Sequence, residues 1–86
     1  MKIEGYEGTT MGGGCTALER DLGGKDVEHV VIMLTDEFGE PTEPTHFPLT
    51  ASVYTANGYD YESSAIMDGP EMLKGYENGV RARFGL

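Results

Sequence analysis

The clearest alternation of apolar and polar residues runs from Phe47 to Tyr54. Every second residue there is apolar, namely Phe47, Leu49, Ala51 and Val53, which predicts a strand with one buried face. The dipeptide Asn57-Gly58 follows, and it favours the two positive-φ positions of a type I′ turn. We therefore predict that Tyr59 to Ala65 folds back antiparallel on this strand.

A second hairpin is predicted upstream. Val27 to Thr35 has the composition of a strand, and Gly23-Gly24-Lys25-Asp26 before it is typical of a tight turn. The segment Cys15 to Leu22 fits two patterns, because its leucines have helical spacing while its residues also alternate as in a strand. We favour the strand, since the turn and strand that follow complete a hairpin.

The two ends of the chain predict one further strand and one helix. Lys2 to Glu7 alternates weakly and predicts an edge strand. Pro70 suits the first turn of a helix, and apolar residues recur after it at helical spacing, namely Met72, Leu73, Tyr76, Val80 and Phe84. The chain is therefore predicted to form a single α+β domain over residues 1–86, with four or five antiparallel strands in two hairpins and a C-terminal helix packed on one face.

The charge of the chain restricts its partners. Fifteen acidic residues against six basic ones give a formal net charge of -9, which disfavours nucleic acid and anionic membranes and favours basic proteins. The single cysteine, Cys15, predicts no internal disulfide, and the first residues lack the apolar region of a secretory signal. Because the longest apolar run is Val30 to Leu34, we expect no membrane span and a cytoplasmic location.

A glycine run invites a comparison with nucleotide-binding motifs. Gly12 to Ala17 matches the pattern G-x-G-x-x-A, and Asp36 follows about twenty residues later, as such a fingerprint requires. A dinucleotide site also needs a buried strand before the glycines, a full helix after them and a parallel sheet, none of which this sequence predicts. We therefore interpret Gly12 to Gly14 as a structural connection, with a small-ligand or nucleotide site over residues 12–16 as the alternative.

Other reactive side chains do not form a recognisable catalytic or metal-binding motif. Cys15 could be combined with His29 or His46 as nucleophile and base, but such residues occur in most chains. The acids between Asp36 and Glu43, with His46, lack the spacing of known calcium or zinc motifs. We expect no enzymatic activity, no cofactor and no metal.

The predicted second hairpin places tyrosines together. A two-residue loop at Asn57-Gly58 pairs Tyr54 with Tyr61, so that Tyr54, Tyr59 and Tyr61 share the face opposite Val53. This face lies away from the helix and is a candidate interface, because tyrosine is enriched at interfaces. Alternatively, the tyrosines pack beneath the glycine-rich segment or the acidic loop of the same chain.

The central strand predicts self-association. Val30 to Leu34 is apolar on both faces, whereas a single helix covers only one. We therefore expect a homodimer or another small oligomer.

Together these features favour a non-enzymatic protein-interaction module. Its predicted partner-binding residues are Tyr54, Tyr59, Tyr61, Asp36, Glu37, Glu40 and Glu43. The expected target is a basic, nucleic-acid-handling protein, inhibited through its anion-binding groove. By analogy, small acidic proteins of phages and mobile elements act in this way, including anti-CRISPR proteins and DNA mimics. A strict DNA mimic needs carboxylates spaced like phosphates, which a sequence does not reveal.

Overall fold

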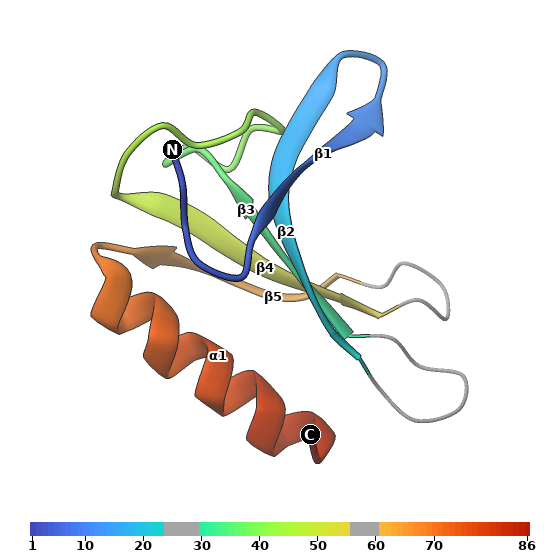
Figure 1. Ribbon diagram of the computed structural model, residues 1–86, viewed down its shortest axis with the longest axis vertical. Helices are drawn as coiled ribbons and strands as arrows, with labels where there is room; N and C mark the ends of the chain where they lie inside the picture. Colours follow the sequence, from blue (N-terminus) through green and yellow to red (C-terminus); the bar gives the residue numbers. More distant parts are fainter. Residues whose placement is uncertain (24–29, 56–60) are drawn as a thin grey trace.

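The computed structural model describes residues 1–23, 30–55 and 61–86, which form one five-stranded sheet and one helix (Figure 1). The elements in chain order are β1 (Glu7–Gly12), β2 (Cys15–Gly23), β3 (Val30–Thr35), β4 (Leu49–Thr55), β5 (Tyr61–Met67) and α1 (Pro70–Phe84). The strands lie side by side in the order of the sequence, and each pair is antiparallel. The predicted α+β fold is therefore confirmed.

Most predicted elements occur close to their expected positions. The segment beginning at Cys15 is strand β2, so the helical alternative for it is wrong. Helix α1 begins at Pro70, as predicted, and ends before Gly85, whose φ of 70° gives the left-handed conformation common after helices. Tyr54 and Tyr61 are register partners, as the predicted hairpin requires. The predicted turns at Asn57-Gly58 and Gly24-Lys25-Asp26 lie outside the described residues.

The predicted strand from Lys2 to Glu7 is wrong, because β1 starts only at Glu7. The residues before it form a turn, in which the Tyr6 amide donates to the Ile3 carbonyl over 3.0 Å. Gly5 has a φ of 88°, which is a turn conformation, and the β-branched Thr9 and Thr10 belong to the strand. The turn delivers Tyr6 to the sheet as a buried side chain.

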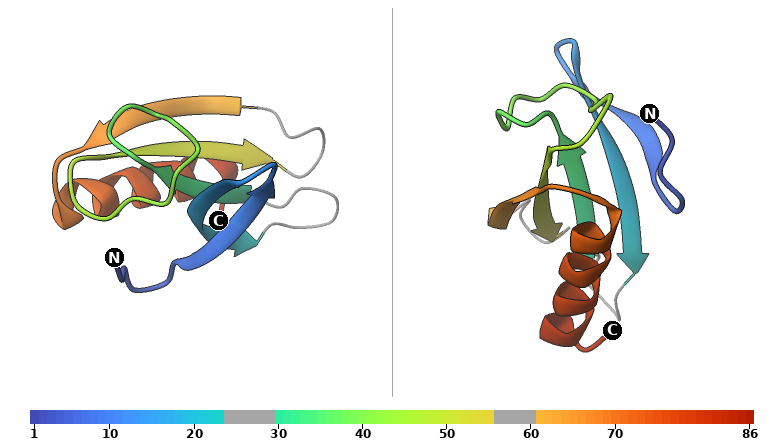
Figure 2. Two further views of the ribbon diagram at one scale, coloured as in Figure 1. Left: turned by 90° about the horizontal axis from the view of Figure 1, so that it is seen from above. Right: turned by 90° about the vertical axis from the view of Figure 1, so that its left-hand side faces the viewer.

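One face of the sheet is covered by α1, and we call it the helix-covered face. The register pairs Ile32 with Val53 and Leu34 with Ala51, so side chains from β3 and β4 meet there and are fully buried. Leu73 and Val80 of α1 belong to the same core. Figure 2 shows the helix running beneath β3 and β4. The described residues include no helix with the length and hydropathy that a bilayer crossing requires.

The opposite face is partly covered by the connection between β3 and β4, residues 36–48, and we call it the loop-covered face (Figure 2). The loop is tied to β2 by two hydrogen bonds: the Thr16 amide donates to the Pro41 carbonyl over 3.0 Å, and the Glu43 amide donates to Thr16 Oγ1 over 2.9 Å. Val31 and Met33 on this face are half-buried. The chain itself thus covers part of the second apolar face that the sequence predicts.

Candidate functional site

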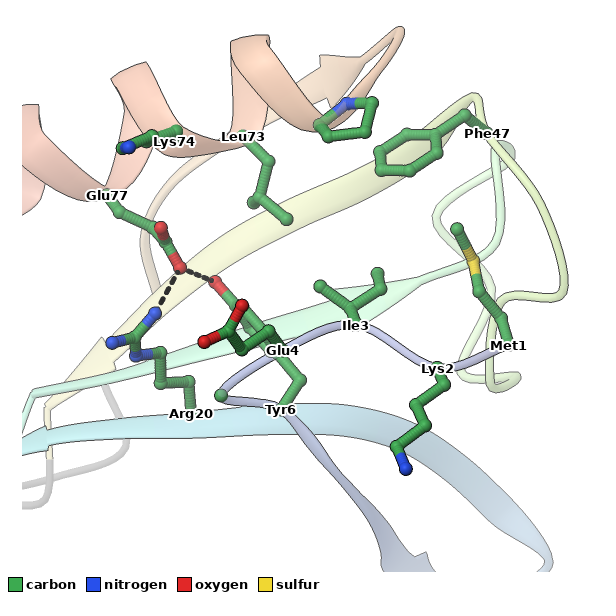
Figure 3. A pocket seen from close by; sticks show the side chains of 12 residues that line it. Met1, Lys2, Ile3, Glu4, Tyr6, Arg20, Phe47, Leu73, Lys74 and Glu77 are labelled. Carbon is green, nitrogen blue, oxygen red and sulfur yellow. Dashed lines mark hydrogen bonds and ion pairs between the residues drawn. The ribbon is translucent and has the colours of Figure 1, made fainter.

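Three side chains from distant parts of the chain meet between the sheet and α1 (Figure 3). Tyr6 precedes β1, Arg20 lies on β2, and Glu77 lies on α1. The Tyr6 hydroxyl donates to Glu77 Oε2 over 2.7 Å, and Arg20 Nη1 donates to the same oxygen over 3.0 Å. The Arg20 guanidinium also lies 6.0 Å from the centre of the Tyr6 ring. We call these three residues the Tyr6 cluster.

The electrostatics of the Tyr6 cluster suit a structural role. Burial, and then the hydrogen bond to the Glu77 carboxylate, raise the pKa of Tyr6 far above its usual value. The phenol therefore stays protonated and donates to the carboxylate, while the Arg20 guanidinium balances the negative charge. A phenol held in this way is not a general base at physiological pH. The cluster joins α1 to β2 and to the segment before β1.

A cavity of about 570 Å³ lies beside the Tyr6 cluster. Its walls include the apolar side chains of Ile3, Phe47 and Leu73. Figure 3 shows that Lys2 points away from α1, so this ammonium group does not converge with Arg20 on a common point. The described charged residues that line the cavity include both acids and bases, among them Glu4, Lys74 and Glu77.

The acidic loop contains an ordered turn at Asp36. The Asp36 Oδ1 atom accepts the amides of Phe38, over 3.0 Å, and of Glu40, over 2.9 Å, and the Gly39 amide donates to the Asp36 carbonyl over 3.0 Å. Gly39 has a φ of 74°, which a residue with a Cβ rarely adopts. The turn directs Phe38 outward, and this side chain is 78% exposed. Glu37 and Glu40, on either side of Phe38, are also exposed.

The four predicted acids thus differ in their surroundings. Glu37 and Glu40 are exposed beside Phe38, whereas Asp36 and Glu43 are half-buried. Asp36 stabilises the turn through its hydrogen bonds. The Glu43 carboxylate lies over Gly8, and a Cβ added at Gly8 would come within 2.8 Å of Glu43 Oε1. Sequence reasoning missed Phe38, although an aromatic residue between two acids and a glycine in a polar loop is itself a signal of an exposed anchor.

Of the predicted tyrosines, Tyr54 lies half-buried on the loop-covered face and Tyr59 lies outside the described residues. The backbone of Tyr61 pairs with that of Tyr54 across β4 and β5. Tyr54 borders a hollow of about 150 Å³ together with Gly39 and Pro41 of the loop. The structure therefore places Tyr54 next to the acidic loop. This position agrees with the alternative interpretation, in which the tyrosines pack beneath the loop.

The same hollow contains a buried hydroxyl group for which the described residues supply no hydrogen-bond partner. Thr50 lines the hollow and is 8% exposed. Within the described part of the chain, its Oγ1 atom has no hydrogen-bond partner. Ser52 and Thr35 add two more hydroxyl groups to the wall. Hydroxyl groups thus form much of the wall that the described residues give this hollow.

The glycine run forms the turn between β1 and β2. Gly12, Gly13 and Gly14 have φ values of 87°, 61° and 82°, and the register shifts between Thr10 and Gly12. A strand rather than a helix follows the run, so the amides of a helix N-terminus do not face it. The structure thus bears out the interpretation of these glycines as a bulged connection.

The other reactive side chains lie in ordinary surroundings. Cys15 is half-buried at the start of β2. The exposed His46 donates from Nδ1 to the Phe47 carbonyl over 3.1 Å, and His29 lies outside the described residues. Over residues 1–23, 30–55 and 61–86, three or more His, Cys, Asp or Glu side chains do not gather in a way that could hold a metal ion.

Comparisons of the chain with protein-family models, with curated proteins and with solved structures find no match.

Proposed function

We propose that this protein is a non-enzymatic interaction module that binds a basic protein through Phe38 and the acids beside it. The exposed position of Phe38 on an ordered turn supports this proposal most directly. Burying such a side chain in a partner contributes about 1.5–3 kcal/mol. Because Asp36 already orders the turn, the entropy cost of fixing Phe38 on binding is low.

The charge around Phe38 indicates the chemistry of the partner. Glu37 precedes and Glu40 follows Phe38 in the chain, both are exposed, and the whole chain carries a formal charge of -9. A complementary surface is an apolar pocket bordered by lysine or arginine side chains, and long-range attraction accelerates the encounter. In its specific form, the proposal is a cytoplasmic inhibitor of a nucleic-acid-handling protein, of the phage or anti-CRISPR type. Tyr54, half-buried beside the loop, extends the proposed contact surface from the loop onto the sheet.

The proposal is tested by capturing proteins from a cell lysate on immobilised wild-type chain and on the Phe38→Ala variant. We expect a basic protein that the wild type retains and that Phe38→Ala loses. Met72→Ala is the control, because Met72 is also an exposed apolar residue but lies on α1. Retention of the same proteins by Phe38→Ala and by the wild type would contradict the proposal.

Surface plasmon resonance then separates the contributions of the anchor and the acids. Phe38→Ala should dissociate faster and bind about 10- to 100-fold more weakly, as the loss of a buried aromatic anchor does. Glu37→Gln with Glu40→Gln should instead slow association and weaken its dependence on salt. If the amide variant associates as fast as the wild type at low salt, the acids have no role in steering.

A further inference from the structure

Strand β5 forms one edge of the sheet, and its outer side has no neighbouring strand among residues 1–23, 30–55 and 61–86. Figure 2 shows β5 at the margin of the sheet, and α1 also approaches β5, whose last residue, Met67, belongs to the core. Ser64, Ala65 and Ile66 are all exposed, although alternate residues of a strand point to opposite faces. Neither the helix nor the loop therefore covers this edge at these residues.

The C-terminal part of this edge, residues 63–67, carries little protection against pairing. Natural edge strands are protected by charged residues, prolines or bulges. Residues 63–67 of β5 carry neither a charge nor a proline, and Ile66 is 44% exposed. Both edge strands have an acid near their start, Glu62 in β5 and Glu7 in β1, and both have a register irregularity in the pairing with their inner neighbour. The edges differ at Ile66 of β5, because the described side chains of β1 include no exposed large apolar group.

We propose that a second copy of this chain pairs with β5 in antiparallel fashion around a two-fold axis. An antiparallel strand is self-complementary, because each copy offers the same backbone donors and acceptors to the other. The strong net charge of -9 opposes self-association over most of the surface, whereas residues 63–67 are uncharged. The pairing also brings the exposed Ile66 side chains of the two copies together on the loop-covered face.

The consequence is a continuous sheet through both copies. With the two-fold axis perpendicular to this sheet, both helices lie on one side and both acidic loops lie on the other. The dimer would then present two Phe38 side chains in the same direction. The dimer does not depend on the partner proposed for Phe38, so the two proposals can fail separately.

Sedimentation equilibrium between roughly 5 and 500 µM tests the proposal. We expect the mass to rise from the chain mass of 9.3 kDa towards twice that value, and more readily at high salt, because salt screens the repulsion between the acidic copies. A mass of one chain under all these conditions would overturn the proposal.

Two variants locate the interface. Ile66→Glu places like charges close to the two-fold axis and should raise the dissociation constant of the dimer at least about tenfold. Thr10→Glu adds the same charge to the exposed edge of β1 and should leave the dimer unchanged. Dissociation by Thr10→Glu with no effect of Ile66→Glu would place the contact elsewhere and reject the β5 interface.

Hydrogen exchange of the wild-type chain gives a test that does not depend on folding of a variant. The outward-facing backbone amides, which belong to alternate residues between Ser64 and Met67, should gain protection as the concentration rises, while amides of β1 should not. If the mass doubles without a gain in protection on β5, the proposed pairing is wrong.

Discussion

The two faces of the sheet bury polar groups in different ways. On the helix-covered face, Glu77 accepts hydrogen bonds from Tyr6 and Arg20, so a buried carboxylate is paired with two donors. On the loop-covered face, the buried Thr50 hydroxyl has no partner in the described part of the chain. The comparison shows that burial alone does not determine what a polar side chain contributes to stability. Removing one member of a hydrogen-bonded buried cluster destabilises the fold, because the remaining polar groups lose their partner. Removing a buried polar group that has no partner costs little stability.

The largest effect is expected from Glu77→Ala. This change leaves the Tyr6 hydroxyl and the Arg20 guanidinium without their shared acceptor, and should lower the free energy of unfolding by about 2–4 kcal/mol. Asn78→Ala is the matched control, because the neighbouring Asn78 is exposed on the same helix. Urea denaturation of both variants measures the difference. Equal midpoints for the two variants would show that the Tyr6 cluster does not stabilise the fold.

A smaller effect is expected from Tyr6→Phe, which removes one donor but keeps the ring. The Glu77 carboxylate retains Arg20, so the loss of unfolding free energy should be about 1 kcal/mol. The measurement is the same urea titration at neutral pH. A loss as large as that of Glu77→Ala would mean that Arg20 alone cannot satisfy the carboxylate.

The raised pKa of Tyr6 predicts that the stability of the fold depends on pH in the alkaline range. Because the pKa of Tyr6 in the folded state lies above its usual value of 10.0, its contribution is fully present below about pH 10 and is lost as the pH rises towards the folded-state value. The wild type should therefore lose stability above pH 10 more steeply than Tyr6→Phe. Thermal unfolding of both proteins from neutral to alkaline pH checks this difference, and parallel curves would refute it.

The smallest effect, and one of opposite sign, is expected from Thr50→Val on the loop-covered face. Valine preserves the shape and removes the unpartnered hydroxyl, so stability should stay equal or rise by up to about 1 kcal/mol. Thr16→Val is the matched control: Thr16 Oγ1 accepts the Glu43 amide, and its loss should cost about 1 kcal/mol. A clear loss of stability in Thr50→Val would indicate that a water molecule satisfies this hydroxyl.

The sequence by itself determined the elements whose patterns are local. The alternation at Leu49, Ala51 and Val53 identifies β4 and its helix-covered face, because side chains of a strand point to opposite faces in turn. The expectation that only one face of this strand is buried is wrong, because Thr50 and Ser52 on the loop-covered face are also buried. Pro70 and the apolar spacing after it identify α1, because both follow from helix geometry. The charge of -9 similarly restricts partners without any knowledge of the fold.

Only the tertiary structure decided which side chains meet. Tyr6 and Glu77 are separated by 71 positions, and Glu77 reads in the sequence as one more acid of a helix, so no spacing rule joins them. The exposure of Phe38 likewise depends on the hydrogen bonds of the Asp36 turn and on the packing of the loop against β2. The start of β1 shifts from Lys2 to Glu7 because the turn before it places Tyr6 against the helix. Contacts of this kind depend on the packing of the whole chain, which a local pattern of apolar and polar residues does not contain.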